Sequence, residues 1–328
     1  MKKFLIFLIA LFLLFNAAIA GLIGYGWNLY KTPGPLQTEK ILVLKKGSGL
    51  RQIATLLESE NIIPHELAFI LGVRLQSLEK KLKAGEYAFT PGMTGEQVAA
   101  LLVSGKSVVH GLTIPEGLQS REVLELIKAS DILTGDITES LPEGSILPET
   151  YHFLRGDTRD SLIQRMKQAF NAEVDALWQA NGPTKHIKSK KDLITLASIV
   201  EKETGLASER PHVASVFLNR LERGMRLQSD PTVIYGVTNG QSDLGRPISK
   251  SDLAAVNDYN TYTRDGLPIG PICNPGLDSL KAVLNPLQTK DLYFVASGDG
   301  GHLFARTLKE HNRNVYKWRK LMKERQSN

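Results

Sequence analysis

The stretch Leu196-Ala-Ser-Ile-Val-Glu-Lys-Glu-Thr204 lies in the clearest helical pattern of the 328-residue chain. Apolar and small residues recur at about 100° per residue over Lys191–Thr204, which predicts a helix with one buried face that ends before Gly205. Glu201 falls at the edge of that face, whereas Glu203 falls about 160° away around the same helix. We therefore expect that the two glutamates do not share a pocket.

Glu201 is the carboxylate that this pattern singles out for acid–base chemistry. At the edge of an apolar face a glutamate is partly desolvated, which raises its pKa and lets it hold a proton near neutrality. Cleavage of a glycosidic bond needs such a proton because the leaving oxygen is weakly basic. The alternative is a surface glutamate in an ion pair with Arg210 or Lys190, and the pattern alone favours this alternative.

The N-terminus predicts a membrane anchor. The apolar run Phe4–Trp27 follows two lysines and, at about 1.5 Å per residue, is long enough to cross about 30 Å of hydrocarbon. Ala18-Ile19-Ala20 also fits the cleavage site of a signal peptide, but the apolar run continues beyond it and favours the anchor. Both interpretations export the rest of the chain.

The remaining sequence predicts an α+β fold in two parts. We expect an N-terminal transmembrane helix (1–30), a small α+β subdomain with its linker (31–110) and a larger α+β domain (111–328). The segment Val43–Ala54 (VLKKGSGLRQIA) resembles the opening of a LysM peptidoglycan-binding module, so the smaller part is expected to be LysM-like. Within the larger part we expect a loop-rich region over Met225–Gly276 and a hairpin of Leu292–Ala296 with His302–Ala305.

Charge and composition exclude several classes of protein. The formal charge of +6 is carried by the segment Arg306–Arg325, which we expect to be a basic amphipathic helix docked on the body; contact with an acidic polymer or anionic lipid is the alternative. No nucleic-acid-binding motif is present. The one cysteine, Cys273, excludes an intramolecular disulfide, and the seven histidines show no metal-ligand spacing. We expect no metal and no organic cofactor.

Several long blocks of the sequence are chemically distinctive, among them Leu196–Thr204, Val213–Leu221, Met225–Gly236, Tyr259–Tyr262 and Asn274–Ala282. In this order, the blocks resemble those of the endolytic murein transglycosylase family. The resemblance runs from the N-terminal anchor to about Asn314. Glu149 departs from it, where an aspartate is expected, and so does Ile269, where a proline is usual.

The resemblance implies an enzyme that cuts the β-1,4 bond between N-acetylmuramic acid and N-acetylglucosamine in nascent strands. It implies 1,6-anhydro ends and the termination of strand elongation. Glu201 would protonate the glycosidic oxygen and then accept the proton of the muramoyl 6-hydroxyl, with no attacking water. Tyr259 and Tyr262 are either sugar-stacking or packing aromatics. The substrate-binding residues implied by the matching motifs are Gln228, Asp230, Tyr235, Tyr259, Asn260 and Tyr262.

The resemblance also implies a location and partners. It predicts a single-pass protein of the inner membrane with its catalytic domain in the periplasm, glycan strands as substrate and peptidoglycan synthases as partners. Two alternatives remain open at this point. One is a non-catalytic peptidoglycan-binding scaffold of the synthesis machinery, and the other is a muramidase that uses water.

Overall fold

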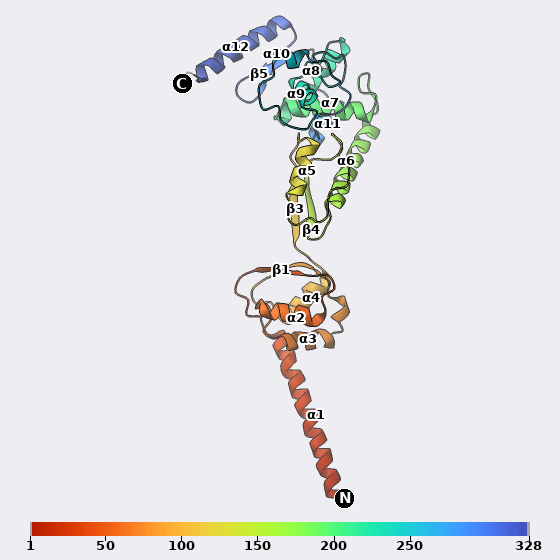
Figure 1. Cartoon of the computed structure of the whole chain (residues 1–328), viewed down its shortest axis with the longest axis vertical. Coiled ribbons are helices and arrows are strands. Elements are labelled where there is room, and N and C mark those ends of the chain that lie inside the picture. Colours follow the sequence, from red (N-terminus) through yellow and green to blue (C-terminus); the bar gives the residue numbers. More distant parts are fainter. Residues whose placement is uncertain (1, 327–328) are drawn as a thin grey trace. The chain divides into compact units, whose positions relative to one another are not determined.

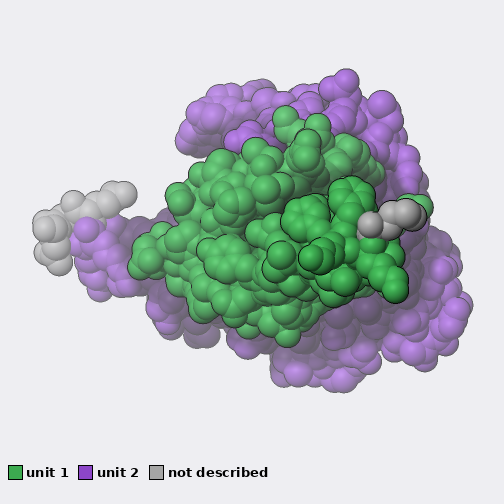
Figure 2. Space-filling view, turned by 90° about the horizontal axis from the view of Figure 1, so that it is seen from below, with its two compact units in different colours: residues 1–110, 153–156 green, residues 111–152, 157–328 purple. Residues whose placement is uncertain are grey.

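The structure, a computed structural model, describes residues 2–326 and divides the chain into two compact units (Figures 1 and 2). Unit 1 is Met1–His110 with Phe153–Gly156, and unit 2 is Gly111–His152 with Asp157–Asn328. The strands β3 (Val109–Thr113) and β4 (Thr150–Leu154) pair with each other in a two-stranded sheet. The helices outnumber the strands and all sheets are small, so the predicted α+β class is confirmed.

The helix α1 (Lys2–Lys31) is long and apolar enough to cross a membrane, a property that anchors and signal sequences share. Its large apolar side chains from Phe4 to Tyr25 are mostly exposed. At its other end Tyr30 is buried in the core of unit 1. The ring of Tyr30 lies so close to Gly72 that a Cβ on that glycine would collide with it. The helix therefore continues past Ala20 without a break and ends inside unit 1.

Unit 1 pairs two strands and packs helices against them. The strands β1 (Lys40–Leu44) and β2 (Gly85–Phe89) pair antiparallel. The helices α2 (Leu50–Ser59) and α3 (Glu66–Leu75) lie between these strands in the sequence. The helix α4 (Gly95–Ser104) begins at a capping box in which Thr94 and Gln97 bond reciprocally. The LysM-like character of this unit stays a prediction.

Unit 2 is built around one buried helix, α7 (Lys190–Glu203). The helix begins at Ser189, whose hydroxyl accepts a hydrogen bond from the amide of Asp192. It contacts three other helices of the unit, so it is buried on more than the single face that the apolar spacing predicts. Even Thr195 and Ser198 are inaccessible to solvent. The other elements of the unit are α5 (Ser120–Lys128), α6 (Arg159–Asn181), α8 (Arg210–Glu222), α9 (Asp230–Thr238), α10 (Lys250–Ala254), α11 (Leu277–Leu284), β5 (Tyr293–Ala296), β6 (His302–Ala305) and α12 (Leu308–Gln326).

The expectation of a loop-rich region over Met225–Gly276 is wrong in part, because this region contains α9 and α10. The helix α9 starts at Asp230-Pro231 and carries apolar residues around much of its surface, so no one-sided period reveals it. It ends at Asn239 in the left-handed conformation, with φ 51°. The predicted hairpin of β5 and β6 is confirmed.

The C-terminal helix α12 packs on the β5–β6 hairpin along one side. Val315, Trp318 and Met322 are half-buried on that side, whereas most of the basic side chains are exposed. The structure therefore confirms the expected basic amphipathic helix docked on the body.

Candidate active site

The last turn of α7 carries two glutamates in different surroundings, as the helical spacing predicts. Glu201 is buried, with 4% of its side chain exposed. Its Oε1 accepts a hydrogen bond from Arg210 at 2.8 Å. Its Oε2 accepts hydrogen bonds from the amide of Gly276 at 2.9 Å and from the Ser279 hydroxyl at 2.7 Å. Donors of this number, one of them a cation, are the usual partners of a buried carboxylate that stays in place.

Arg210 is the centre of a cluster of carboxylates. Besides Glu201 it binds Glu116 at 2.7 Å and lies 3.7 Å from Asp278. Burial acts to lower the pKa of Arg210, but the charges of Glu201 and Glu116 raise it overall. These contacts fasten the end of α7 to α8, to the turn that holds Glu116 and to the start of α11.

Glu203 points into a cavity instead. It is half-buried, and its Oε1 accepts a hydrogen bond from the Ser229 hydroxyl at 2.5 Å. Burial raises its pKa to about 7; the Ser229 bond and the charge of Arg220 oppose the rise, and the charge of Asp230 adds to it. A carboxyl group with such a pKa can both give and take a proton near neutrality.

The cavity beside Glu203 has a volume of about 330 Å³. Its wall combines aromatic rings with a few polar groups, which is the lining expected of a ligand-binding site. The buried Arg220 forms part of this wall and donates to the carbonyl oxygens of Leu227 and Leu292. The lining residues are Glu203, Phe217, Arg220, Leu227, Gln228, Asp230, Tyr262, Tyr293, Phe294, Leu308 and His311.

Comparison with known proteins assigns the family. The model of the YceG-like family matches residues 42–317, which is most of the chain. The chain belongs to the YceG-like family.

Relatives of this YceG-like chain include proteins named endolytic murein transglycosylase. The one from Bacillus subtilis is 31% identical over 308 residues, covering 84% of this chain and 83% of the relative. The one from Streptococcus pneumoniae is 29% identical over 361 residues; the match covers 93% of this chain but 64% of that longer relative. A crystal structure of a YceG-like protein from Listeria monocytogenes matches with a TM-score of 0.53 and 31% identity, over 85% of this chain and 99% of that one.

Three of the six residues expected to bind substrate gather at the cavity beside Glu203. Gln228, Asp230 and Tyr262 all line it. The Tyr262 hydroxyl donates to Asp230 Oδ1 at 2.6 Å. Gln228 adopts a left-handed backbone conformation, with φ 50°, and its backbone N–H donates to the carbonyl oxygen of Thr261. Such a conformation is unfavourable for glutamine, so the surrounding structure holds this residue against its preference.

The other three expected residues lie elsewhere. The rings of Tyr235 and Tyr259 pack together, with centroids 4.6 Å apart. Tyr235 lines a second cavity of about 440 Å³ together with Glu143, and burial raises the pKa of Glu143 to about 6. Asn260 is wholly buried, and its amide nitrogen donates to backbone carbonyls, among them that of Ala255. We therefore assign Asn260 a structural part in the loop that carries Tyr262.

The contacts of Glu201 do not match the half-apolar setting expected for the acid. The ion pair with Arg210 is present, although it is buried rather than at the surface. Glu201 is not among the residues that line the cavity, whereas Glu203 is. Sequence reasoning also missed Ser229 and His311. Ser229 precedes the unpredicted helix α9, and the sequence analysis assigned His311 no role in the site.

Among residues 2–326, no group of three or more His, Cys, Asp or Glu side chains is arranged to hold a metal ion.

Proposed function

We propose that the chain is a lytic transglycosylase of peptidoglycan. It cuts the β-1,4 bond between N-acetylmuramic acid and N-acetylglucosamine inside nascent strands, leaves 1,6-anhydro ends and thereby terminates elongation. The names of its relatives from Bacillus subtilis and Streptococcus pneumoniae support this activity. The observation that carries the proposal is the carboxyl group of Glu203, whose pKa is about 7, in a cavity lined by aromatic and polar side chains.

Glu203 acts first as acid and then as base in this proposal. Its carboxyl group gives a proton to the glycosidic oxygen as the bond to C1 of the muramoyl residue breaks. The resulting carboxylate takes the proton of the 6-hydroxyl of the same residue as that oxygen closes on C1. The proton count balances within one turnover, and no water is consumed.

Asp230 supplies negative charge next to this carboxyl group. Its charge acts to raise the pKa of Glu203, and its position on the cavity wall allows it to stabilise positive charge that develops at C1. The hydrogen bond from Tyr262 fixes the direction of the Asp230 carboxylate. Asp230 activates no water in this mechanism, because the 6-hydroxyl is the nucleophile.

We assign Glu201 a positioning role in this mechanism. Its buried contacts with Arg210, Gly276 and Ser279 fix the last turn of α7, so that Glu203 faces the cavity. The assignment of Glu201 as the acid, which the family motif suggests, is the rival hypothesis. The two hypotheses predict different results for the glutamine substitutions. If Glu203 is the acid, Glu203→Gln abolishes cleavage, and if Glu201 is the acid, Glu201→Gln does.

The helix α1 supports a location for this activity. We infer that α1 anchors the chain once in the inner membrane and that residues 31–328 lie in the periplasm. A site at that surface meets glycan strands as peptidoglycan synthases release them. The synthases are therefore the expected protein partners.

The products of the reaction test this function. The full chain in detergent micelles is incubated with purified peptidoglycan, and the released glycans are weighed by mass spectrometry. Lytic cleavage leaves ends that are lighter by one water than hydrolytic ends. Reducing ends would instead identify a muramidase, and intact strands would identify a binding scaffold.

A further inference from the structure

His311 is a titratable residue of the cavity that the mechanism above does not use. It lies in the first turn of α12 and lines the same cavity as Glu203, Asp230 and Tyr262. Its ring stacks on Tyr293, with centroids 5.2 Å apart and planes inclined by 27°. Its Nδ1 is buried and has no hydrogen-bond partner among residues 2–326. Because a nitrogen that is shielded from water is also shielded from a ligand, the imidazole can meet a ligand in the cavity only through its other nitrogen, Nε2.

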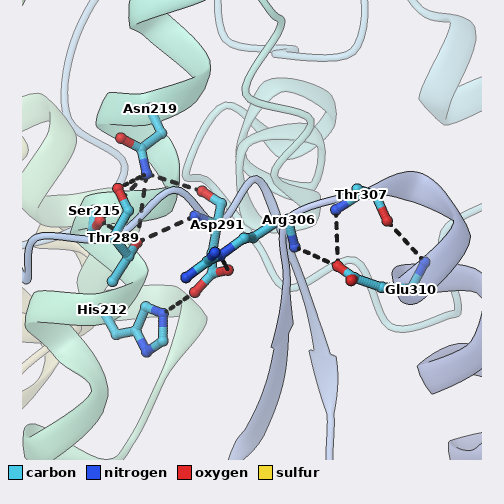
Figure 3. A network of polar contacts seen from close by, with 8 residues as sticks. All are labelled: His212, Ser215, Asn219, Thr289, Asp291, Arg306, Thr307 and Glu310. Atoms are coloured by element: carbon cyan, nitrogen blue, oxygen red, sulfur yellow. Dashed lines mark hydrogen bonds and ion pairs between the residues drawn. The ribbon is translucent and has the colours of Figure 1, made fainter.

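A chain of polar contacts holds the start of α12 in place (Figure 3). Glu310, the neighbour of His311, accepts hydrogen bonds from the amides of Arg306 and Thr307 and donates its own amide to the Thr307 hydroxyl. The Arg306 guanidinium lies 3.7 Å from Asp291. The first turn of α12 is thereby tied to Asp291, in the segment just before β5.

The same chain of contacts continues to α8 (Figure 3). Asp291 is paired with His212 at 2.8 Å, and its carbonyl accepts a hydrogen bond from Asn219 at 3.0 Å. Both partners belong to α8, the helix that also supplies Arg220 and Phe217 to the cavity wall. The position of His311 is therefore fixed relative to that wall, which is the precision that a binding group needs.

The surroundings favour an uncharged imidazole. Burial lowers the pKa of His311, and the nearby charge of Arg220 lowers it further. An uncharged imidazole has one donor and one acceptor nitrogen. Nε2 can therefore donate to, or accept from, a hydroxyl or acetamido group of a sugar, according to the tautomer.

We propose that His311 binds the glycan in this cavity through a hydrogen bond between its imidazole and a hydroxyl or acetamido group of an N-acetylated sugar. The proposal rests on the function proposed above and names a substrate-positioning residue for it. In this arrangement the C-terminal helix is part of the active site. Loss of the hydrogen bond weakens binding of the strand and leaves the proton transfers of Glu203 in place.

The kinetic test compares variants of the full chain in detergent micelles on uncross-linked glycan strands. His311→Phe keeps a flat ring against Tyr293 but removes both nitrogens, whereas His311→Gln restores a polar group. The control is His186→Phe, which removes an imidazole paired with Glu222 at 2.6 Å, outside the cavity. We expect His311→Phe to raise KM about tenfold with kcat nearly unchanged, the size of one ordinary hydrogen bond. His311→Gln regains part of the loss, and the control stays within about twofold of the wild type.

A binding test separates this proposal from the proposed function. The Glu203→Gln chain, with and without His311→Phe, is titrated calorimetrically with a β-1,4-linked tetramer of N-acetylglucosamine. About tenfold weaker binding by the double variant supports the role of His311, whether or not Glu203 proves to be the acid. Equal binding by both chains, or a KM of His311→Phe within about twofold of wild type, overturns it. Equal loss in His311→Phe and His311→Gln also overturns it, because that result indicates packing alone.

Discussion

The surroundings of Glu201 and of Glu203 differ although only one residue separates them on α7. Glu201 is fixed by a buried arginine, a backbone amide and a hydroxyl. Glu203 has one hydroxyl partner, a nearby like charge and a cavity in front of it. Glu201 is buried and Glu203 is half-buried, so burial alone does not decide which of them is the catalytic acid. The partners decide, because a paired cation holds a carboxylate in place whereas a neighbouring carboxylate favours the protonated form.

The largest expected effect is on cleavage by the two glutamine variants. Glu203→Gln keeps the shape of the side chain but cannot transfer a proton, so we expect its rate to fall by on the order of 10²–10⁴. Glu201→Gln should keep most of the activity of each folded molecule. Single-turnover cleavage of purified glycan strands measures both rates. A larger fall in rate for Glu201→Gln than for Glu203→Gln would identify Glu201 as the acid.

The second effect concerns the stability of the Arg210 cluster. Replacement of Arg210 by leucine leaves Glu201 buried without its cation, and we expect a loss of about 3–5 kcal/mol in the free energy of unfolding. Glu201→Gln should cost less, because Arg210 keeps Glu116 and Asp278 as partners. Urea unfolding of the full chain in micelles measures the difference. If the leucine variant were as stable as the wild type, the cluster would not fix the end of α7.

The third effect is a gain rather than a loss in the free energy of unfolding, and it concerns Glu203. Its pKa is about 7 in the folded chain against an ordinary value of 4.5, so between these pH values the folded state binds more protons than the unfolded state. Stability that this group contributes is therefore lost as the pH rises from about 4.5 to about 7. We expect Glu203→Gln to be more stable than wild type above pH 7, by up to roughly 3 kcal/mol.

Unfolding curves of the wild type and Glu203→Gln at pH 4 and pH 8 provide the check. The gain in stability should be present at pH 8 and absent at pH 4. A variant that is less stable than wild type at pH 8 would mean that the Glu203 carboxylate is stabilised rather than strained by its surroundings.

A smaller effect is a shift of the pH–rate profile. Cleavage needs the protonated form of Glu203, so its rate should fall as the pH rises through about 7. Asp230→Asn removes a charge that raises this pKa and should move the fall to lower pH. Ser229→Ala removes a hydrogen bond that lowers it and should move the fall to higher pH. Shifts in the same direction, or none, would argue against Glu203 as the acid.

The smallest expected effect is that of a chelator. The mechanism uses carboxyl and hydroxyl groups alone, so we expect EDTA to leave the rate of cleavage unchanged. Loss of activity in EDTA followed by recovery with zinc would contradict the mechanism.

The sequence predicts much of the frame of this site. The helix Lys191–Thr204 agrees with α7 to within one residue at each end, and its period separates Glu201 from Glu203 correctly. The resemblance to a family indicates Gln228, Asp230 and Tyr262 as substrate-binding residues, and the structure places these three around one cavity.

The choice between the two glutamates could not be predicted from the spacing. Both flank the apolar face of α7, and their partners come from distant segments: Gly276 and Ser279 for Glu201, Ser229 for Glu203. Gly276 precedes α11, and Ser229 precedes α9, a helix that shows no clear period, so nothing local in the sequence pairs these residues with α7. A helix that is surrounded on several sides offers no single solvent face from which to infer the direction of a cavity.

Direct observation of the Glu203 proton tests the central claim of this account. Difference infrared spectra between the wild type and Glu203→Gln, recorded on the full chain across pH 4 to 9, isolate the band of this one carboxyl group. We predict a protonated carboxyl band that is present at pH 6, disappears with a midpoint near pH 7 and is missing from the variant. A difference spectrum that shows only carboxylate at pH 6 would contradict the assignment of Glu203 as the acid.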